Sequence, residues 1–270
     1  MTTPSPETKP LSFLDLLDLE ELAADLYSAR SPLAGRTRVY GGQVVAQALE
    51  AARRTVDPEH HVHSLHGYFI RSGDESKPII LDVDRIRDGR SFSTRRVVAK
   101  QAGGAIFNLS ASFHRREPDE EFARPVDISD VPPPEACELE MWDEISPIYL
   151  VPDTPEGRAM AWCKIAIPEQ LPDDEHLHAI AVAYTSDHIP MDSIRSGHPG
   201  TEDWDQFMGA SLDHSVWLHR PARADEWLLF DMHLQSLRGS RGVSHGTVHT
   251  ADGQLVATVA QEGLLRKLTK

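Results

Sequence analysis

The sequence is poor in cysteine, in basic residues and in long apolar runs, and each shortage excludes a class of protein. Its two cysteines, Cys137 and Cys163, are too few for a disulfide framework and lack the spacing of a zinc site. The 27 Lys and Arg residues are outnumbered by 42 Asp and Glu, and the net charge of −15 argues against nucleic acid as a partner. No apolar run reaches the ~18 residues of a membrane span, and the N-terminus lacks the apolar segment of a secretory signal. We therefore expect a cytoplasmic protein with no membrane span.

The chain is nevertheless apolar enough to fold, and its first half predicts one helix and four strands. Hydrophobic residues make up 40% of the 270 positions, which suffices for a core. Residues 1–10, rich in Pro, Thr and Ser, predict a disordered tail. The run "YGGQVVAQALEAARRTV" has its apolar residues at helical spacing. Four segments rich in β-branched and aromatic residues follow between positions 62 and 114, separated by glycine-containing turns.

The second half repeats this pattern. Residues 116–150 are acidic and Pro-rich and predict a surface linker. A shift of 149 residues then aligns "GGAIFNLSASF" with "DGQLVATVAQE" and "HSLHGYFIR" with "LDHSVWLHR". We interpret the chain as an α+β protein of two tandem units, at 11–115 and 151–270. Each unit is a long helix wrapped by a curved antiparallel sheet.

Three polar residues of the second half are candidates for chemistry, and each also has a structural interpretation. Asp187 extends the apolar stripe of a predicted helix, where burial would raise its pKa, or it is a solvated helix stop. Gln261 continues the alternation of a predicted strand, where a buried amide can orient a water or a carbonyl. The structural interpretation is that it ends the strand at the rim of the sheet. Ser211 opens a strand and is by itself typical of a turn.

Two other patterns lead to no site. "GVSHG" matches the G-x-S-x-G nucleophile elbow around Ser244, but the elbow needs a helix after the serine. Here the chain continues as a strand, an Asp-Gly turn and another strand, so Ser244 is interpreted as a strand residue. Asp213 and His214 are adjacent in a strand and point to opposite faces, which argues against a dyad. The histidines lack metal-ligand spacing, so we expect no metal and no cofactor.

With these residues in hand, the sequence resembles the type II acyl-CoA thioesterases of the TesB-like family. The resemblance covers about residues 14–266 and rests on several stretches taken in this order: "VYGGQVVAQAL", "HSLHGYFIRSGD", "DGRSFSTRRV", "AYTSD", "DHSVWLHRP", "EWLL" and "DGQLVATVAQEG". It implies a double hotdog fold and hydrolysis of acyl-CoA by an activated water.

The resemblance also implies which residues act. The family's Asp, its Thr or Ser, and its Gln fall on Asp187, Ser211 and Gln261, while Ser112 stands opposite Gln261 in the first half. That first unit is therefore expected to be a non-catalytic copy. CoA phosphates need cations, and the candidates are Arg90, Arg95, Arg96, Arg238 and Arg241.

Two alternatives to hydrolysis stay open, a non-catalytic acyl-CoA-binding module and a hotdog enoyl-CoA hydratase. The second is disfavoured because His188 cannot share the helix face of Asp187. Pairing of hotdog units across sheet edges leads us to expect a homo-oligomer.

Overall fold

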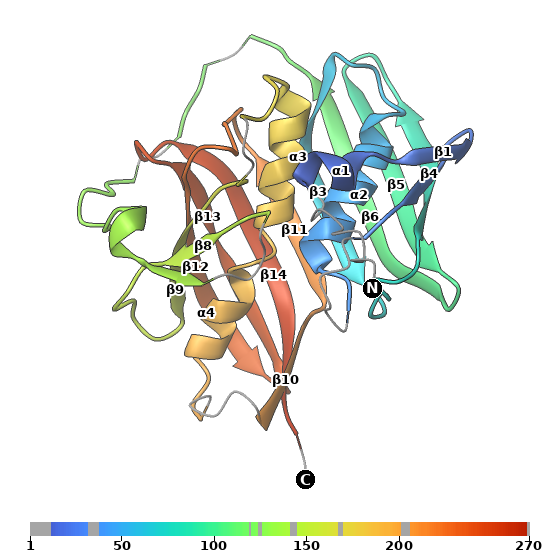
Figure 1. Cartoon of the computed structure of the whole chain (residues 1–270). Coiled ribbons are helices and arrows are strands. Elements are labelled where there is room, and N and C mark those ends of the chain that lie inside the picture. The colour runs from blue at the N-terminus through green and yellow to red at the C-terminus, as the bar shows by residue number, and fades with distance from the viewer. Residues whose placement is uncertain are drawn as a thin grey trace, which may run out of the picture.

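The computed structural model shows a large sheet that curls around a small number of helices (Figure 1). It describes residues 12–31, 38–118, 120–123, 126–140, 145–166, 170–200 and 206–268. The tail predicted at residues 1–10 lies outside the described residues.

Where the structure describes it, the first half consists of two helices and six strands. They are α1 (Phe13–Leu17), β1 (Glu20–Ala23), β2 (Leu26–Ala29), α2 (Gly41–Arg53), β3 (His60–Phe69), β4 (Ile79–Asp88), β5 (Phe92–Gln101) and β6 (Gly104–Arg115). Every residue of α2 from Gly42 to Ala52 is buried. Its alanines, valines and glycines permit this because small side chains let the sheet and a second helix approach from opposite sides.

The second half repeats a helix within a sheet and adds a short helix and extra strands. Its elements are η1 (Pro134–Ala136), β7 (Glu138–Glu140), β8 (Ile148–Leu150), β9 (Arg158–Cys163), α3 (Glu175–Thr185), α4 (Pro190–Ser196), β10 (Phe207–Ser211), β11 (Asp213–Leu218), β12 (Leu228–Arg238), β13 (Arg241–Thr250) and β14 (Leu255–Lys267). The segment predicted as a linker thus contains β7 and β8. Both pair within the sheet, so part of 116–150 belongs to the second half's sheet.

All fourteen strands of the described residues form one sheet. Thirteen follow the order β1-β2-β4-β5-β6-β3-β11-β14-β13-β12-β9-β8-β7, and β10 pairs with β14 off this path. The two halves meet where β3 and β11 pair antiparallel, with His66 opposite Ser215. These two residues are 149 positions apart, so the repeat has its pseudo-two-fold centre at this pair.

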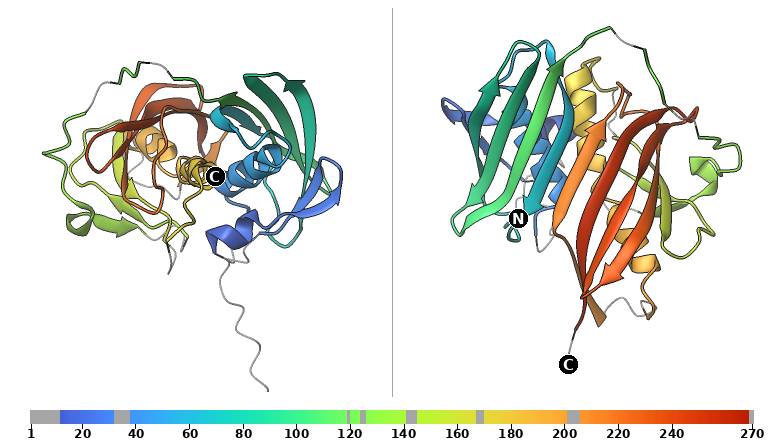
Figure 2. Two further views of the ribbon diagram at one scale, coloured as in Figure 1. Left: turned by 90° about the horizontal axis from the view of Figure 1, so that it is seen from above. Right: turned by 180° about the vertical axis from the view of Figure 1, so that it is seen from behind.

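The helices lie on the concave side of the sheet. Figure 2 shows α2 and α3 side by side in the view from above, with each half of the sheet curving around one of them. Their buried faces join the strands in one large apolar cluster. This arrangement brings the end of α3 close to the start of α2. Among the described helices, none combines the length and apolarity needed to cross a membrane.

Candidate active site

Asp187 lies directly beyond the end of α3 and is buried. The helix ends at Thr185 with Ser186 as its C-cap, so the chain does leave the helix before the carboxylate, as one sequence interpretation held. The side chain is not solvated, however, because Asp187 is only 7% exposed. A buried carboxylate needs donors around it to be stable.

The donors come from two other elements. The Oγ of Ser211, the last residue of β10, donates to Oδ1 of Asp187 over 3.2 Å. The backbone N–H of Gly42, in the first turn of α2, also donates to this carboxylate. Gly41 leaves room for the approach, because a Cβ at that position would overlap Oδ2 of Asp187 and the ring of Phe69. The carboxylate therefore faces the positive end of a helix dipole.

Gln261 and His214 extend the hydrogen-bond chain inward. Nε2 of Gln261 donates to Oγ of Ser211 over 2.8 Å, and Oε1 of Gln261 contacts Nδ1 of His214 at 2.6 Å. Nε2 of His214 contacts Oγ of Ser186 at 2.8 Å. Since the amide oxygen can only accept, His214 carries its proton on Nδ1. The hydrogen bonds thus run in one direction: His214 donates to Gln261, Gln261 donates to Ser211, and Ser211 donates to Asp187.

Burial shifts the pKa values at both ends of this chain. Desolvation raises the pKa of Asp187 to about 7, against the opposing hydrogen bonds from Ser211, Gly42 and Gln261. Desolvation lowers the pKa of His214 to about 4, against the opposing hydrogen bond with Gln261. Near neutral pH the carboxylate is therefore poised to exchange a proton, while the imidazole is neutral and acts as a hydrogen-bond donor.

The structure thus brings together Asp187, Ser211 and Gln261, and it adds groups that sequence reasoning missed. His214 entered that reasoning only as part of a rejected dyad, and Asp213 indeed points elsewhere and accepts from the backbone N–H of Glu262 at 2.6 Å. The alternation of His214 with the buried Val216 was the available signal for an inward-facing imidazole. No sequence pattern could identify Gly42 as a donor to Asp187, because this hydrogen bond depends on where α3 ends relative to the start of α2.

Ser244 is the strand residue that the sequence predicted. It lies within β13, opposite Gln261 on β14, and the residues described after it, up to 268, form no helix. Its buried Oγ contacts Oγ of Ser193 on α4 at 2.6 Å. The G-x-S-x-G match is therefore part of the packing between a strand and a short helix.

The five arginines proposed for CoA lie at two separate ends of the molecule, and one is excluded. Arg95 is wholly buried and donates to Thr55 and Asp88, so its prediction as a CoA contact is wrong on structural grounds. Arg96 pairs with Asp84 at 2.9 Å, and Arg90 lies in the same β4–β5 hairpin.

Arg238 and Arg241 flank the β12–β13 turn, close to β10. Arg241 is opposite Leu264 of β14, and Leu264 is opposite Ala210, which precedes Ser211. Arg38, which sequence reasoning missed, donates to the carbonyl oxygen of Gly209 over 3.1 Å. Arg38 thus lies beside β10, whereas Arg241, like its partner Glu262, lies on the sheet face opposite Gln261. The described residues contain no group of three or more His, Cys, Asp or Glu arranged to hold a metal ion.

Comparisons with known proteins agree with this architecture. The family models described as acyl-CoA thioesterase N-terminal and C-terminal domains match residues 29–114 and 107–265. Human acyl-coenzyme A thioesterase 8 is 36% identical over 291 aligned residues, which cover 93% of this chain and 88% of that protein.

Two solved structures agree in fold. The crystal structure of acyl-CoA thioesterase II TesB2 from Mycobacterium marinum has a TM-score of 0.85 at 38% identity, covering 96% of this chain and 99% of that one. A hot dog fold protein from Alicyclobacillus acidocaldarius, at 17% identity, has a TM-score of 0.77 with 95% and 98% coverage.

These matches confirm the α+β double hotdog and the enzyme class that the sequence resemblance implied. Together, the two domain models span most of the chain in the order of its two halves. The chain belongs to the acyl-CoA thioesterase family.

Proposed function

We propose that this protein hydrolyses acyl-CoA thioesters to a free carboxylic acid and CoA, by direct attack of a water that Asp187 activates. The observation that carries the proposal is the buried Asp187 carboxylate, whose pKa is raised to about 7 and which accepts from Ser211 and from the start of α2. An exposed carboxylate is too weak a base for this task, since its ordinary pKa is about 4. Burial supplies the basicity.

The reaction balances without a covalent enzyme intermediate. The water oxygen forms a bond to the thioester carbonyl carbon, and its proton passes to the Asp187 carboxylate. The tetrahedral intermediate then expels the CoA thiolate by breaking the carbon–sulfur bond, and the thiolate takes the proton from Asp187. A thiolate leaves readily, so general-base help of roughly 10²–10⁴-fold is an adequate contribution from the side chain.

Ser211 and Gln261 are proposed to position the water and the carboxylate. The Ser211 hydroxyl lies between the Gln261 amide and Asp187, so it fixes the rotamer of the carboxylate. His214 fixes the orientation of the Gln261 amide through the 2.6 Å contact at Oε1. We assign His214 as a positioning residue because its ring nitrogens contact Gln261 and Ser186, so that it acts on Asp187 through Gln261 and Ser211.

The phosphates of CoA are proposed to bind on the side of Arg38, Arg238 and Arg241. The overall charge of −15 disfavours an anionic ligand, so a local group of cations is needed. Arg38 is tied to β10 through Gly209, and Arg241 pairs with Glu262 at 2.9 Å. Gly209 stands two residues before Ser211, and Glu262 is adjacent to Gly263, the strand partner of Ser211.

The decisive experiment is thiol release from a panel of acyl-CoA chain lengths with Asp187→Asn, Ser211→Ala and Gln261→Ala. We expect Asp187→Asn to lower kcat at least about 10²-fold, since it removes the base. The other two should lower kcat by about tenfold or more through lost positioning. The wild-type kcat/KM should rise with pH and level off above an apparent pKa near 7, because only the deprotonated Asp187 accepts a proton.

A matched control is Ser110→Ala, which removes an exposed hydroxyl from β6 and should leave thiol release unchanged. Full activity in folded Asp187→Asn protein would sink the assignment of the base. Thermal stabilisation of the wild-type protein by acyl-CoA with no thiol release would instead indicate the non-catalytic binding module.

A further inference from the structure

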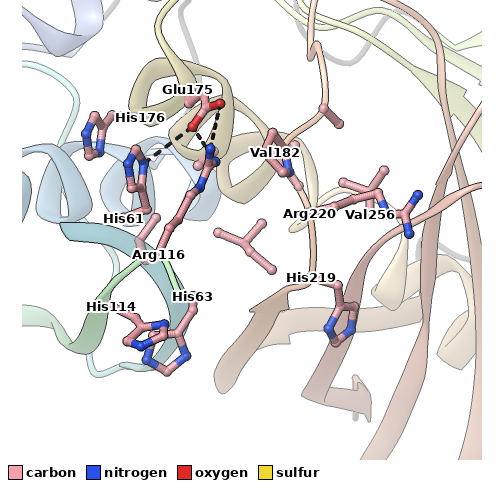
Figure 3. Close-up of a pocket in the computed structure, with 15 residues that line it drawn as sticks. His61, His63, His114, Arg116, Glu175, His176, Val182, His219, Arg220 and Val256 are labelled. Atoms are coloured by element: carbon pink, nitrogen blue, oxygen red, sulfur yellow. Dashed lines mark hydrogen bonds and ion pairs between the residues drawn. The ribbon is translucent and has the colours of Figure 1, made fainter. Parts of the chain in front are cut away.

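A cavity lies at the opposite end of α3 from Asp187. Its volume is about 180 Å³, and it opens between the start of α3, the start of β3, the end of β6 and the segment that follows β11 (Figure 3). It shares no lining residue with the Asp187 site. We call it the α3 N-terminal pocket.

The pocket occupies the position that the internal repeat relates to the catalytic site. Shifting by 149 residues relates Ser211 to Val62 and Gly263 to His114, and both Val62 and His114 line the pocket. The same shift relates Gln261 to Ser112, whose Oγ contacts Nε2 of the lining residue His63 at 2.8 Å.

The groups proposed for catalysis are absent from this counterpart. Val62 has no hydroxyl and Ser112 has no amide. Asp187 stands two positions after the end of α3. The residue at the same place after the end of α2 is Thr55. Its Oγ1 is held by the buried Arg95 over 2.7 Å. The counterpart position therefore lacks the three groups proposed for catalysis.

The rim of the pocket is positively charged. Arg116 pairs with Glu175, and Nδ1 of His61 lies 3.5 Å from the same carboxylate, as the dashed lines in Figure 3 show. Arg220 donates to the neutral Oε1 of Gln254 over 2.7 Å. Its carboxylate contact among the described residues is Glu121, 3.6 Å away and 83% exposed. Arg220 therefore keeps a positive charge that the lining does not neutralise.

The histidines of the rim add hydrogen-bonding capacity without adding much charge at neutral pH. Burial lowers the pKa of His61, His63 and His219, so each imidazole is mainly neutral there. His61 is also held by stacking on His176, with the ring centroids 4.5 Å apart. An anion at the rim would thus meet the Arg220 guanidinium, whose carboxylate contact Glu121 lies outside the pocket lining, and several mainly neutral imidazoles.

The floor of the pocket is apolar, and it decides what kind of anion fits. Ala179 and Val182 of α3, Leu218 of β11 and Val256 of β14 supply it. We propose that the α3 N-terminal pocket binds a small carboxylate with a short apolar tail, its carboxylate at Arg220 and its tail against these side chains. A cavity of about 150 Å³ accommodates benzene, so this one admits a tail of about five or six carbons.

The experiment is a titration with hexanoate, followed by the methyl NMR signals of Val182, Leu218 and Val256. We expect these signals to shift saturably with a dissociation constant of the order of millimolar, and those of Leu81 and Val97 in the first half's core to stay in place. Arg220→Gln should raise the dissociation constant by about tenfold, since it removes a charge-assisted contact. Ala179→Phe should abolish the shifts by filling the cavity.

The controls separate charge, tail and fold. Arg96→Gln removes an exposed arginine outside the pocket and should leave the binding unchanged. Inorganic phosphate lacks the tail and hexan-1-ol lacks the charge, so both should bind more weakly than hexanoate. Equal binding of phosphate, unshifted pocket methyls in wild-type protein, or hexanoate binding unaltered in both folded pocket variants would each overturn the proposal. The readout needs no turnover and should be the same in Asp187→Asn protein, so it fails or succeeds independently of the proposed hydrolysis.

Discussion

Asp187 is a carboxylate on which burial and hydrogen bonding act in opposite directions. Desolvation disfavours the charged form, while Ser211, Gly42 and Gln261 favour it, and burial is the larger effect. The raised pKa suits a general base near neutral pH, but it also costs stability once the carboxylate is charged.

We therefore predict that Asp187→Asn stabilises the protein, and increasingly so as the pH rises. The pKa of Asp187 is about 7 in the folded chain, against 3.8 for an unperturbed aspartate side chain. Between these values the folded protein holds a proton that the unfolded chain has released, so wild-type stability falls as pH increases and levels off above about 7. The asparagine does not titrate. The gap in free energy of unfolding should grow by roughly 3 kcal/mol between pH 5 and pH 8.

Urea denaturation of both proteins at the two pH values measures this gap. Asp84→Asn on the exposed face of β4 is the matched control, because surface substitutions usually change stability by no more than about 0.5 kcal/mol. A gap that is the same at pH 5 and pH 8 would show that Asp187 does not titrate in this range.

At the scale of elements, the site depends on how closely the start of α2 approaches the end of α3. Gly41 has no side chain where Asp187 and Phe69 crowd it, and Gly42 supplies a backbone donor. The hydroxyl of Tyr40 donates to the carbonyl oxygen of Tyr184 over 2.9 Å and ties the two helices together at this point. The geometry of the proposed catalytic site is thus set by a contact between two helix termini.

This contact predicts that Gly41→Ala damages the enzyme although alanine is the better helix former. In an unconstrained helix the change would stabilise by up to about 1 kcal/mol. Here the new Cβ would overlap Oδ2 of Asp187, so we expect kcat/KM for thiol release to fall by about tenfold or more.

Gly103→Ala is the control, because a Cβ there meets nothing within 4 Å. Thiol release that stays at the wild-type level in both variants would show that the α2–α3 approach is looser than the structure indicates.

At the scale of the whole molecule, the two repeats form one continuous sheet. The β3–β11 pair lies at its centre, and Leu65 and Val216 face each other there with no exposure. Helices α2 and α3 pack together over the same junction. The halves are therefore expected to unfold together, although the sequence describes them as separate units. The expected homo-oligomer stays a prediction.

We predict that Leu65→Ala lowers the free energy of unfolding by about 2–5 kcal/mol through the cavity it leaves. Because Leu65 lies at the junction, urea denaturation should still show one transition, shifted as a whole. The exposed Ile86→Ala on β4 is the control and should change stability by about 0.5 kcal/mol or less. Two separated transitions would contradict a single cooperative unit.

Local patterns in the sequence predicted much of the fold and part of the site. Period-two and helical spacing located α2, α3 and the long strands, because each pattern depends only on neighbouring residues. Strand alternation placed Gln261 on the same face as Ala257 and Val259, as β14 has it. The strands β7 and β8 were missed, since three-residue strands in a Pro-rich segment leave little periodicity to detect.

The sequence by itself determined the repeat of two helix-and-sheet units, the exclusion of Ser244 as an elbow nucleophile and, through family resemblance, the three candidate catalytic residues. Only the tertiary structure decided that Asp187 is buried, that His214 orients Gln261 and that Arg95 belongs to the core. It also decided that a cavity lies at the position that the repeat relates to the Asp187 site. These features depend on strand register and on the contact between two helix termini, which join residues far apart in the chain and leave no local periodic signal.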